Sequence, residues 1–358
     1  MKTLVLRVDS QKPDATKIRV AADFVRKGRL VAFPTETVYG LGADALNAKA
    51  VLRLFEAKKR PLDNPPIVHV CEARQVRELA EGVPKNAERL MGKFWPGPLT
   101  LIFRRSDVVP SVTVAGLDTI AVRMPKHNVA LTLIRESGCP IAAPSANLAG
   151  RPSPTSAQHV LKDLDGRIDA VLDSGPTSVG VESTVLDLTV DPPEVLRPGG
   201  IPFEALKEVL ENVKLSPFAV AERALPLEKS RSPGMKHRHY APKASVMVVE
   251  GELSAMVEKV KELAGLYTKR GDRVGILGTD ETVGNYTASV VKSLGSRSDL
   301  AGVARNLFRI LREFDDEGVS VVIAEGVPSE GLGLAVMNRL RKASGYHIVR
   351  ASDCEKHL

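Results

Sequence analysis

FPTETVYGLG (residues 33–42) joins the end of an apolar segment, RLVAF (residues 29–33), to two threonines, a glutamate and a tyrosine. The apolar segment has the length and composition of a buried strand. In open α/β sheets, ligands bind outside the carboxyl ends of strands, so we expect Thr35 and Thr37 to lie at a binding site. On spacing alone, a capped turn that leads into the next helix explains these residues equally well.

The sequence on either side alternates between helical and strand patterns. Residues 14–28 repeat apolar side chains at helical spacing, and residues 47–59 form a second amphipathic segment with Asn47 in the position of an N-cap. Short apolar segments typical of strands follow at residues 66–70, 99–103, 119–123, 140–143, 170–174, 183–188 and 194–198. Because several of these lie too close together for crossover helices, residues 1–215 are predicted to form a large α/β domain with a mixed sheet.

A second, smaller domain is expected after a connecting segment. Residues 216–243 are rich in proline, serine and basic residues and show no helical or strand period, so we predict a linker there. Residues 244–358 return to alternating strand and helix patterns. Such alternation is typical of a doubly wound α/β fold, so we predict a Rossmann-like C-terminal domain.

Composition is that of an ordinary globular protein. The chain has 358 residues, of which 43% are hydrophobic and 26% are charged. No apolar segment reaches the ~18 residues needed to cross a bilayer, and the first residues lack the apolar core of a secretory signal. The three cysteines form no CxxC pair, which disfavours a zinc ribbon or a disulfide framework. We therefore expect a cytoplasmic protein with no membrane partner.

Positive charge is concentrated in the first two thirds of the chain. The net charge is +7, yet residues 244–358 carry 15 Lys and Arg against 16 Asp and Glu. The excess in the first domain and the linker suits a polyanionic ligand such as a nucleotide or RNA, although a merely basic surface explains it equally well. No Walker A or GxGxxG pattern is present, so a nucleotide would be bound without the common loops.

Several polar and cationic side chains lie beside the predicted strands and helix ends. A helix is expected to end at EAKKRP (residues 56–61), where Lys58, Lys59 and Arg60 exceed what interaction with the helix dipole requires. Arg123 ends an apolar strand, and an arginine there needs an anion or a surface for its stem. The other candidates in such settings are Asn64, His69, Ala143, Ser145, Asn147, Ser153, Ser183 and Arg197. Each is ambiguous alone, and together they indicate an anionic ligand.

These residues carry a resemblance to a known family. FPTETVYGLG, the Lys58-x-Arg60 pair and Ser145-x-Asn147 are similar to the signature of YrdC-like proteins. SPGMKHRHYAP (residues 232–242) and SEGLGLAVMNRLRKAS (residues 329–344) resemble the longer, two-domain threonylcarbamoyl-adenylate synthases. The resemblance covers essentially the whole chain, with one departure at Pro66, where the family pattern has leucine. It implies a twisted mixed-sheet domain with a cationic cleft, followed by a Rossmann-like domain.

The resemblance also implies an activity and the residues that perform it. L-threonine, bicarbonate and ATP would give threonylcarbamoyl-AMP and pyrophosphate, and a partner complex would transfer the threonylcarbamoyl group to an adenosine beside the anticodon of tRNA. Lys58 and Arg60 would act on the triphosphate as the catalytic pair. The residues expected to contact ATP are Lys58, Arg60, Asn64, Thr119, Ser145, Asn147, Ser153, Arg197 and Tyr240. Those expected to contact threonine are Thr35, Thr37, His69, Arg123, Ala143 and Ser183.

Some roles stay open at this point. Family spacing favours Thr37 over Thr35 as the threonine contact, and neither a general base nor a bicarbonate site is assigned. Mg²⁺ is expected to arrive with ATP, because the sequence shows no dedicated carboxylate cage. His237 and His239 have a spacing that metal ligands can adopt, but no third ligand is evident.

By resemblance, the linker is also a lid over the active site, with Tyr240 reaching a phosphate or the ribose. Two other functions fit the chain. A non-catalytic RNA-binding module would bind tRNA weakly, but an aromatic content of 4% disfavours base stacking. A carbamoyl-transfer enzyme that uses carbamoyl phosphate would be expected to carry a zinc-finger-like cysteine region, which this sequence lacks.

Overall fold

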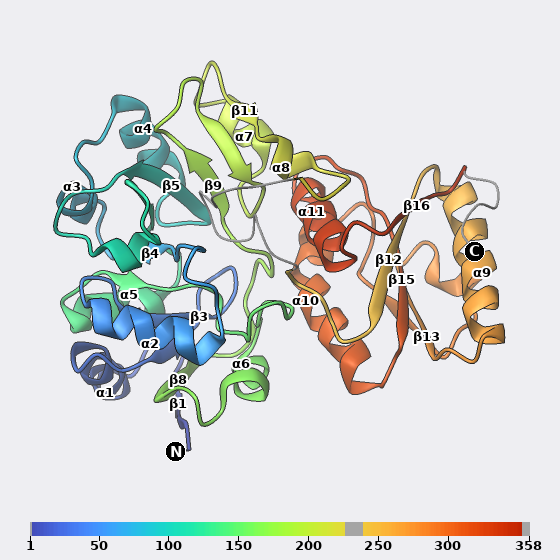
Figure 1. Ribbon diagram of the computed structural model, residues 1–358, viewed down its shortest axis with the longest axis horizontal. Helices are drawn as coiled ribbons and strands as arrows, with labels where there is room; N and C mark the ends of the chain where they lie inside the picture. The colour runs from blue at the N-terminus through green and yellow to red at the C-terminus, as the bar shows by residue number, and fades with distance from the viewer. Residues whose placement is uncertain (1, 226–238, 353–358) are drawn as a thin grey trace. The chain divides into compact units, whose positions relative to one another are not determined.

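The computed structural model describes residues 2–225 and 239–352, which divide into two compact units (Figure 1). Among these residues, unit 1 comprises 2–149 and 153–219, and unit 2 comprises 150–152, 220–225 and 239–352. Residues 226–238, which form much of the predicted linker and include His237, lie outside the described residues. Each unit is therefore considered by itself.

Unit 1 is built on an 11-stranded mixed sheet with the strand order β1-β8-β2-β3-β7-β4-β6-β5-β9-β10-β11. Its strands are β1 (Leu4–Arg7), β2 (Val31–Phe33), β3 (Gly40–Asp44), β4 (Val68–His69), β5 (Leu99–Arg104), β6 (Thr119–Arg123), β7 (Ile141–Ala142), β8 (Ala170–Asp173), β9 (Thr184–Asp187), β10 (Glu194–Arg197) and β11 (Lys214–Leu215). The pair β5·β9 is parallel, whereas β2·β3 is antiparallel. The mixed sheet predicted from the sequence is thus confirmed.

Helices pack on both sides of β2. Val31 and Phe33 belong to a core cluster with residues of α1 (Ala15–Arg26) and α5 (Asn128–Ser137). Ala32 belongs to a different cluster, with residues of α2 (Ala48–Lys58) and α6 (Ala157–Leu164). Successive residues of a strand point to opposite faces. Because both faces of β2 are buried, its sequence is continuously apolar rather than alternating.

The remaining helices before the undescribed segment are short. They are η1 (Ala73–Gln75), α3 (Val76–Leu79), α4 (Lys85–Phe94), η2 (Ser111–Val114), α7 (Phe203–Lys207) and α8 (Pro217–Val220). The predicted cap of α2 is confirmed, since the Asn47 side chain accepts hydrogen bonds from the amides of Lys49 and Ala50. The helix ends where Lys59 adopts a left-handed conformation at φ 50°, two residues before Pro61.

The alternative for FPTETVYGLG, a turn leading into a helix, is wrong. The second half of the motif forms β3, which runs antiparallel to β2 with Phe33 paired to Gly40. Glycine is required inside this strand, because a Cβ on Gly42 would lie 2.8 Å from the Ile141 side chain and 2.9 Å from that of Phe33. β1 was also not predicted, because LVLR at residues 4–7 is short and largely exposed.

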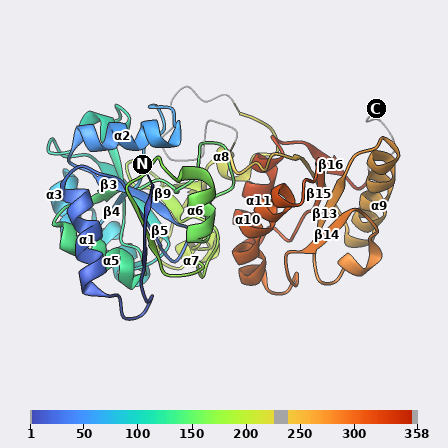
Figure 2. The same ribbon diagram turned by 90° about the horizontal axis from the view of Figure 1, so that it is seen from below.

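Unit 2 contains a five-stranded sheet with the order β14-β13-β15-β12-β16, in which every pairing is parallel. Its strands are β12 (Ser245–Glu250), β13 (Val274–Gly278), β14 (Val290–Ser293), β15 (Val321–Glu325) and β16 (Ile348–Arg350). Its helices are α9 (Leu253–Lys269), η3 (Val283–Asn285), α10 (Leu300–Asp316) and α11 (Gly333–Ala343). Figure 2 shows the sheet between α9 on one side and α10 and α11 on the other. The doubly wound parallel arrangement expected for the C-terminal domain is confirmed.

Candidate active site

The loop that follows β2 is fixed by hydrogen bonds between its own residues. Thr35 Oγ1 donates to the Val38 carbonyl at 2.7 Å and lies 2.8 Å from Thr37 Oγ1. The Thr37 amide donates to Thr35 Oγ1 at 3.1 Å. Hydroxyl side chains commonly stabilise turns in this way. The backbone of Glu36, which lies between the two threonines, is therefore held in one conformation.

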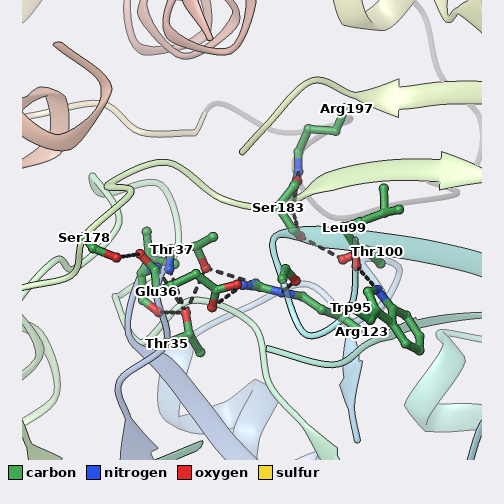
Figure 3. Close-up of polar contacts among 12 residues, drawn as sticks. Thr35, Glu36, Thr37, Trp95, Leu99, Thr100, Arg123, Ser178, Ser183 and Arg197 are labelled. Carbon is green, nitrogen blue, oxygen red and sulfur yellow. Dashed lines mark hydrogen bonds and ion pairs between the residues drawn. The ribbon is translucent and has the colours of Figure 1, made fainter. Parts of the chain in front are cut away.

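Glu36 and Arg123 form a buried ion pair beside this loop (Figure 3). Arg123 Nη2 lies 2.7 Å from Glu36 Oε2, and the two residues are 3% and 6% exposed. Arg123 Nη1 donates to Thr37 Oγ1 at 2.9 Å, and Nε donates to the Gly97 carbonyl at 3.2 Å. Arg123 thus meets the predicted need for an anionic partner, but that partner is a residue of the same unit.

His69 lies next to Arg123, because the two residues are register partners in the parallel pair β4·β6. Its Nδ1 is 3.2 Å from the Ile67 carbonyl oxygen, and its ring packs edge-on against Phe33. Burial, with a further contribution from the positive charge of Arg123, lowers the pKa of His69 to about 3. The imidazole is therefore neutral at physiological pH and can make hydrogen bonds without adding charge.

Lys58, Ser145 and Asn147 form a second cluster. Lys58 ends α2 and is 1% exposed, and its Nζ donates to the backbone carbonyls of Ser145 and Asn147. Ser145 Oγ donates to Asn147 Oδ1 at 2.5 Å. The structure thus brings together two motifs that are far apart in the sequence.

Arg60 and Asn64 shape the loop after α2. Arg60 Nε donates to the Asn64 carbonyl at 2.9 Å, and Nη2 donates to the Pro65 carbonyl at 3.3 Å. Asn64 is 1% exposed, and its Oδ1 accepts no hydrogen bond from any residue that the structure describes. A buried amide oxygen in this state can accept a hydrogen bond from a ligand.

Ser183 and Arg197 form a third cluster at the right of Figure 3. Ser183 Oγ lies 2.7 Å from Thr100 Oγ1, and Arg197 Nη2 donates to the Ser183 carbonyl at 2.9 Å and to Ser183 Oγ at 3.2 Å. Gly199 allows this contact, because a Cβ there would lie 2.3 Å from backbone atoms of Ser183 and Thr184. Gly199 therefore serves a close backbone approach.

Hydrogen bonds between loops join these clusters into one region of unit 1. The backbone bonds are Val179 N to Glu36 O (2.8 Å), Gly180 N to Thr37 O (3.1 Å), Tyr39 N to Pro154 O (2.8 Å), Ala143 N to Ile67 O (2.8 Å) and Ala146 N to Tyr39 O (2.8 Å). In addition, Ser153 Oγ donates to Glu182 Oε1 at 2.6 Å. Most of the predicted site residues therefore belong to connected loops.

Two predicted ATP contacts lie apart from this network. Thr119 begins β6 and Arg123 ends it, so at the usual strand rise their Cα atoms are about 13 Å apart. Tyr240 belongs to unit 2, where its ring stacks on Phe308 at a centroid distance of 5.3 Å. The guanidinium of Arg339 lies 5.4 Å from the centroid of the same ring. The roles of Thr119 and Tyr240 stay predictions.

Three polar residues of this region were absent from the predicted site: Glu36, Thr100 and Glu182. Glu36 lies inside the FPTETVYGLG motif and Glu182 precedes Ser183, so both positions carried a signal in the sequence. Thr100 lies inside the apolar segment LTLIF, where a threonine is ordinary strand composition. Its contact with Ser183 depends on the pairing of β5 with β9, which the sequence does not reveal.

Metal ligands are not grouped in the described parts of the chain. In residues 2–225 and 239–352, no group of three or more His, Cys, Asp or Glu side chains is arranged to hold a metal ion. His237 lies outside the described residues, so the structure does not test the disfavoured alternative of a metal site at His237 and His239. None of the helices in the same ranges is long and apolar enough to cross a bilayer.

Comparison with known proteins defines the class to which this fold and site belong. Residues 23–199 match the Sua5/YciO/YrdC profile, described as telomere recombination. Residues 201–345 match the profile described as the C-terminal domain of threonylcarbamoyl-AMP synthase. The class is therefore a YrdC-type α/β domain followed by the C-terminal domain of these synthases.

Similarity to individual proteins extends over nearly the whole chain. The threonylcarbamoyl-AMP synthase of Pyrococcus abyssi is 51% identical to this chain, and the match covers 97% of this chain and 99% of the relative. The threonylcarbamoyl-AMP synthase of Bacillus subtilis is 48% identical, and the match covers 96% of this chain and 97% of the relative. The crystal structure of P. abyssi Sua5 complexed with L-threonine matches with a TM-score of 0.92 at 50% identity, covering 97% of this chain and 99% of the other. The chain belongs to the threonylcarbamoyl-AMP synthase family.

Proposed function

We propose that this protein is an L-threonylcarbamoyladenylate synthase, which converts L-threonine, bicarbonate and ATP into threonylcarbamoyl-AMP and pyrophosphate. The observation that carries the proposal is the similarity to curated synthases across both domains, at 51% identity over 99% of the P. abyssi protein. The polar network of unit 1 supplies side chains that suit each substrate.

Threonine would be bound near Arg123. A guanidinium can bind both oxygens of a carboxylate, and the P. abyssi relative was crystallised with L-threonine. Thr37, His69 and Ser183 would then contact the amine or the hydroxyl, with Thr35 and Ala143 shaping the loops around them. A site that hydrogen-bonds the threonine hydroxyl rejects valine, because its buried polar groups would be left unpaired.

ATP would be bound by the cations and amides on the other loops. Lys58, Arg60 and Arg197 supply positive charge for the phosphates, and Asn64, Ser145, Asn147 and Ser153 supply hydrogen bonds. Magnesium would enter as the ATP complex, because the described residues of this region include carboxylates only in separate contacts, Glu36 with Arg123 and Glu182 with Ser153. Tyr240 and the linker would close over the nucleotide and exclude water from the reactive product.

The reaction needs positioning and positive charge more than an activated side chain. The ammonium group of threonine first loses a proton. The free amine then attacks either CO₂, with loss of a second proton, or bicarbonate, with loss of water, and both routes give an N-carboxylated amino acid. Its new carboxylate attacks the α-phosphate of ATP, and pyrophosphate leaves. Negative charge develops on phosphate oxygens, where Lys58 and Arg60 would stabilise it.

The product would be used by a second enzyme. A mixed anhydride between a carbamate and AMP is a reactive acyl donor, so we propose that a partner complex transfers the threonylcarbamoyl group to an adenosine beside the anticodon of tRNA. The positive charge of the first domain would also allow weak binding of tRNA itself.

Pyrophosphate release tests this function. It should require ATP, threonine and bicarbonate together, should fall when valine replaces threonine, and should stop when any substrate is omitted. If a folded protein with Mg²⁺ released no pyrophosphate but bound tRNA in a salt-dependent manner, the RNA-binding alternative would replace the proposed function.

A further inference from the structure

Glu36 has an unusual setting for a carboxylate. It is 6% exposed, and neither Oε1 nor Oε2 accepts a hydrogen bond from a described residue. Its contact with Arg123 Nη2 is short, at 2.7 Å, but lacks the alignment of a hydrogen bond. Buried carboxylates are normally surrounded by donors. Glu36 therefore has unused acceptor capacity inside the polar network.

The position of Glu36 is imposed by its loop. Its carbonyl accepts a hydrogen bond from the Val179 amide at 2.8 Å, and the flanking threonines bond to each other. Figure 3 shows the carboxylate pointing from this loop toward the guanidinium of Arg123. A carboxylate and a guanidinium are thus held side by side by two rigid elements, the loop and the end of β6.

We propose that Glu36 determines specificity by receiving the ammonium group of the amino-acid substrate while Arg123 receives its carboxylate. This inference rests on the proposed function, because it takes threonine to be the ligand of Arg123. An amino acid carries both charges on neighbouring atoms, so one ligand can satisfy both side chains. An ammonium has three N–H donors, which match the unused acceptor capacity of Glu36.

The charges explain why such a residue is needed in this enzyme. Arg123 alone would attract any anion, including bicarbonate and the phosphates of ATP. Because Glu36 lies beside Arg123, a simple anion is attracted by the guanidinium but repelled by the carboxylate. A zwitterion gains from both groups. The pair therefore selects the amino acid among three substrates, two of which are only anionic.

The other explanation is that the pair only stabilises the fold. Buried ion pairs are weak evidence for stability, because desolvation offsets much of their attraction. A buried carboxylate with a purely structural role is also expected to accept several hydrogen bonds, as Glu325 of unit 2 does from Thr282 Oγ1 at 2.8 Å and from Tyr286. Glu36 accepts no such bond from residues 2–225 or 239–352, which favours a role toward a ligand.

Binding measurements on two ligands separate these explanations. Calorimetry would compare L-threonine with 2,3-dihydroxybutanoate, in which a hydroxyl replaces the ammonium, for the wild type and Glu36→Gln. Loss of a charge-assisted contact should weaken threonine binding about 10- to 100-fold in the variant. Binding of the deaminated analogue should be unchanged or tighter. The matched control is Asp187→Asn, a buried carboxylate of β9 that bonds to Thr189 and should leave both affinities unchanged.

Each outcome decides one question. Equal weakening of both ligands, or unchanged threonine binding, would overturn the role of Glu36 and leave the proposed function intact. Absence of threonine binding to the wild type in the presence of ATP would instead overturn the proposed function. If Glu36→Gln does not fold, the same comparison is made with Glu36→Asp, whose shorter side chain withdraws the carboxylate and should weaken threonine binding at least about tenfold while leaving the deaminated analogue unaffected.

Discussion

His69 shows how the environment of one residue produces a measurable pH effect. Its pKa is lowered to about 3 in the folded protein, chiefly by burial, whereas an unfolded histidine titrates near 6.5. Between these values only the unfolded state binds the proton, so the folded state loses stability as the pH falls below about 6.5. Above that range the histidine is neutral in both states and contributes no pH dependence.

We therefore expect His69→Gln to flatten the acid side of the stability profile. Urea unfolding at pH 7 and pH 5 should show that the wild type loses about 2 kcal/mol more than the variant over this interval. Equal losses in the two proteins would mean that His69 is protonated in the folded state, and the neutral imidazole assigned here would be wrong.

The need of individual charged side chains for a partner was the most predictable feature of the site. Arg123 inside an apolar strand requires a partner whatever the fold, and the structure supplies Glu36. The grouping of Lys58 with Ser145 and Asn147 followed from family resemblance, and the hydrogen bonds that Lys58 Nζ donates to the Ser145 and Asn147 carbonyls confirm that they are neighbours. Glu36 and Thr100 were missed because their importance comes from contacts with distant segments.

At the scale of elements, long apolar or amphipathic segments were predictable and short ones were not. The strands and helices of unit 2 follow the expected alternation, because its central strands β12, β13 and β15 are buried on both faces and are therefore largely apolar. β3 contains two glycines in five residues and has little intrinsic strand preference. Pairing with β2 and β7 determines its conformation, and that pairing is a tertiary effect.

The turn after β10 contains Gly199, which lies against the backbone of residues 183–184. Gly199→Ala would place a methyl group 2.3 Å from the backbone of the 183–184 segment, so the Ser183–Arg197 contact must move. We expect a loss of about 1–3 kcal/mol in the free energy of unfolding, together with reduced kcat/KM for threonine.

The matched control is Gly92→Ala in α4, where an added Cβ meets no atom within 4 Å. Alanine is favoured over glycine in a helix interior, so this variant should be unchanged or about 0.5–1 kcal/mol more stable. Chemical denaturation of both variants checks the pair. If Gly199→Ala were as stable and as active as Gly92→Ala, the close approach would not constrain the site.

At the scale of the whole molecule, the two domains differ in charge and in their links to the site. The site network lies in unit 1, whereas the Tyr240 ring packs in unit 2 against Phe308 and Arg339. The charge distribution favours an anionic ligand on the first domain and the linker, and it gave no information about the role of the C-terminal domain.

Tyr240→Phe tests the lid role predicted for the linker. The substitution keeps the ring that stacks on Phe308 and removes only the hydroxyl, so the protein should still fold. If the hydroxyl contacts ATP, kcat should fall about tenfold or more. Tyr267→Phe in α9 is the control and should have wild-type activity, since Tyr267 is assigned no contact with substrate. Wild-type kinetics for Tyr240→Phe would remove the hydroxyl from the mechanism.

The most direct test of the proposed synthase activity is mass spectrometry of the nucleotide product formed from ATP, threonine and carbon-13 bicarbonate. We expect a threonine–AMP adduct that contains the labelled carbon and that disappears when threonine is omitted. An adduct without the label would mean that threonine is adenylated directly through its own carboxylate. In that case the carbamoylation step proposed here would be wrong.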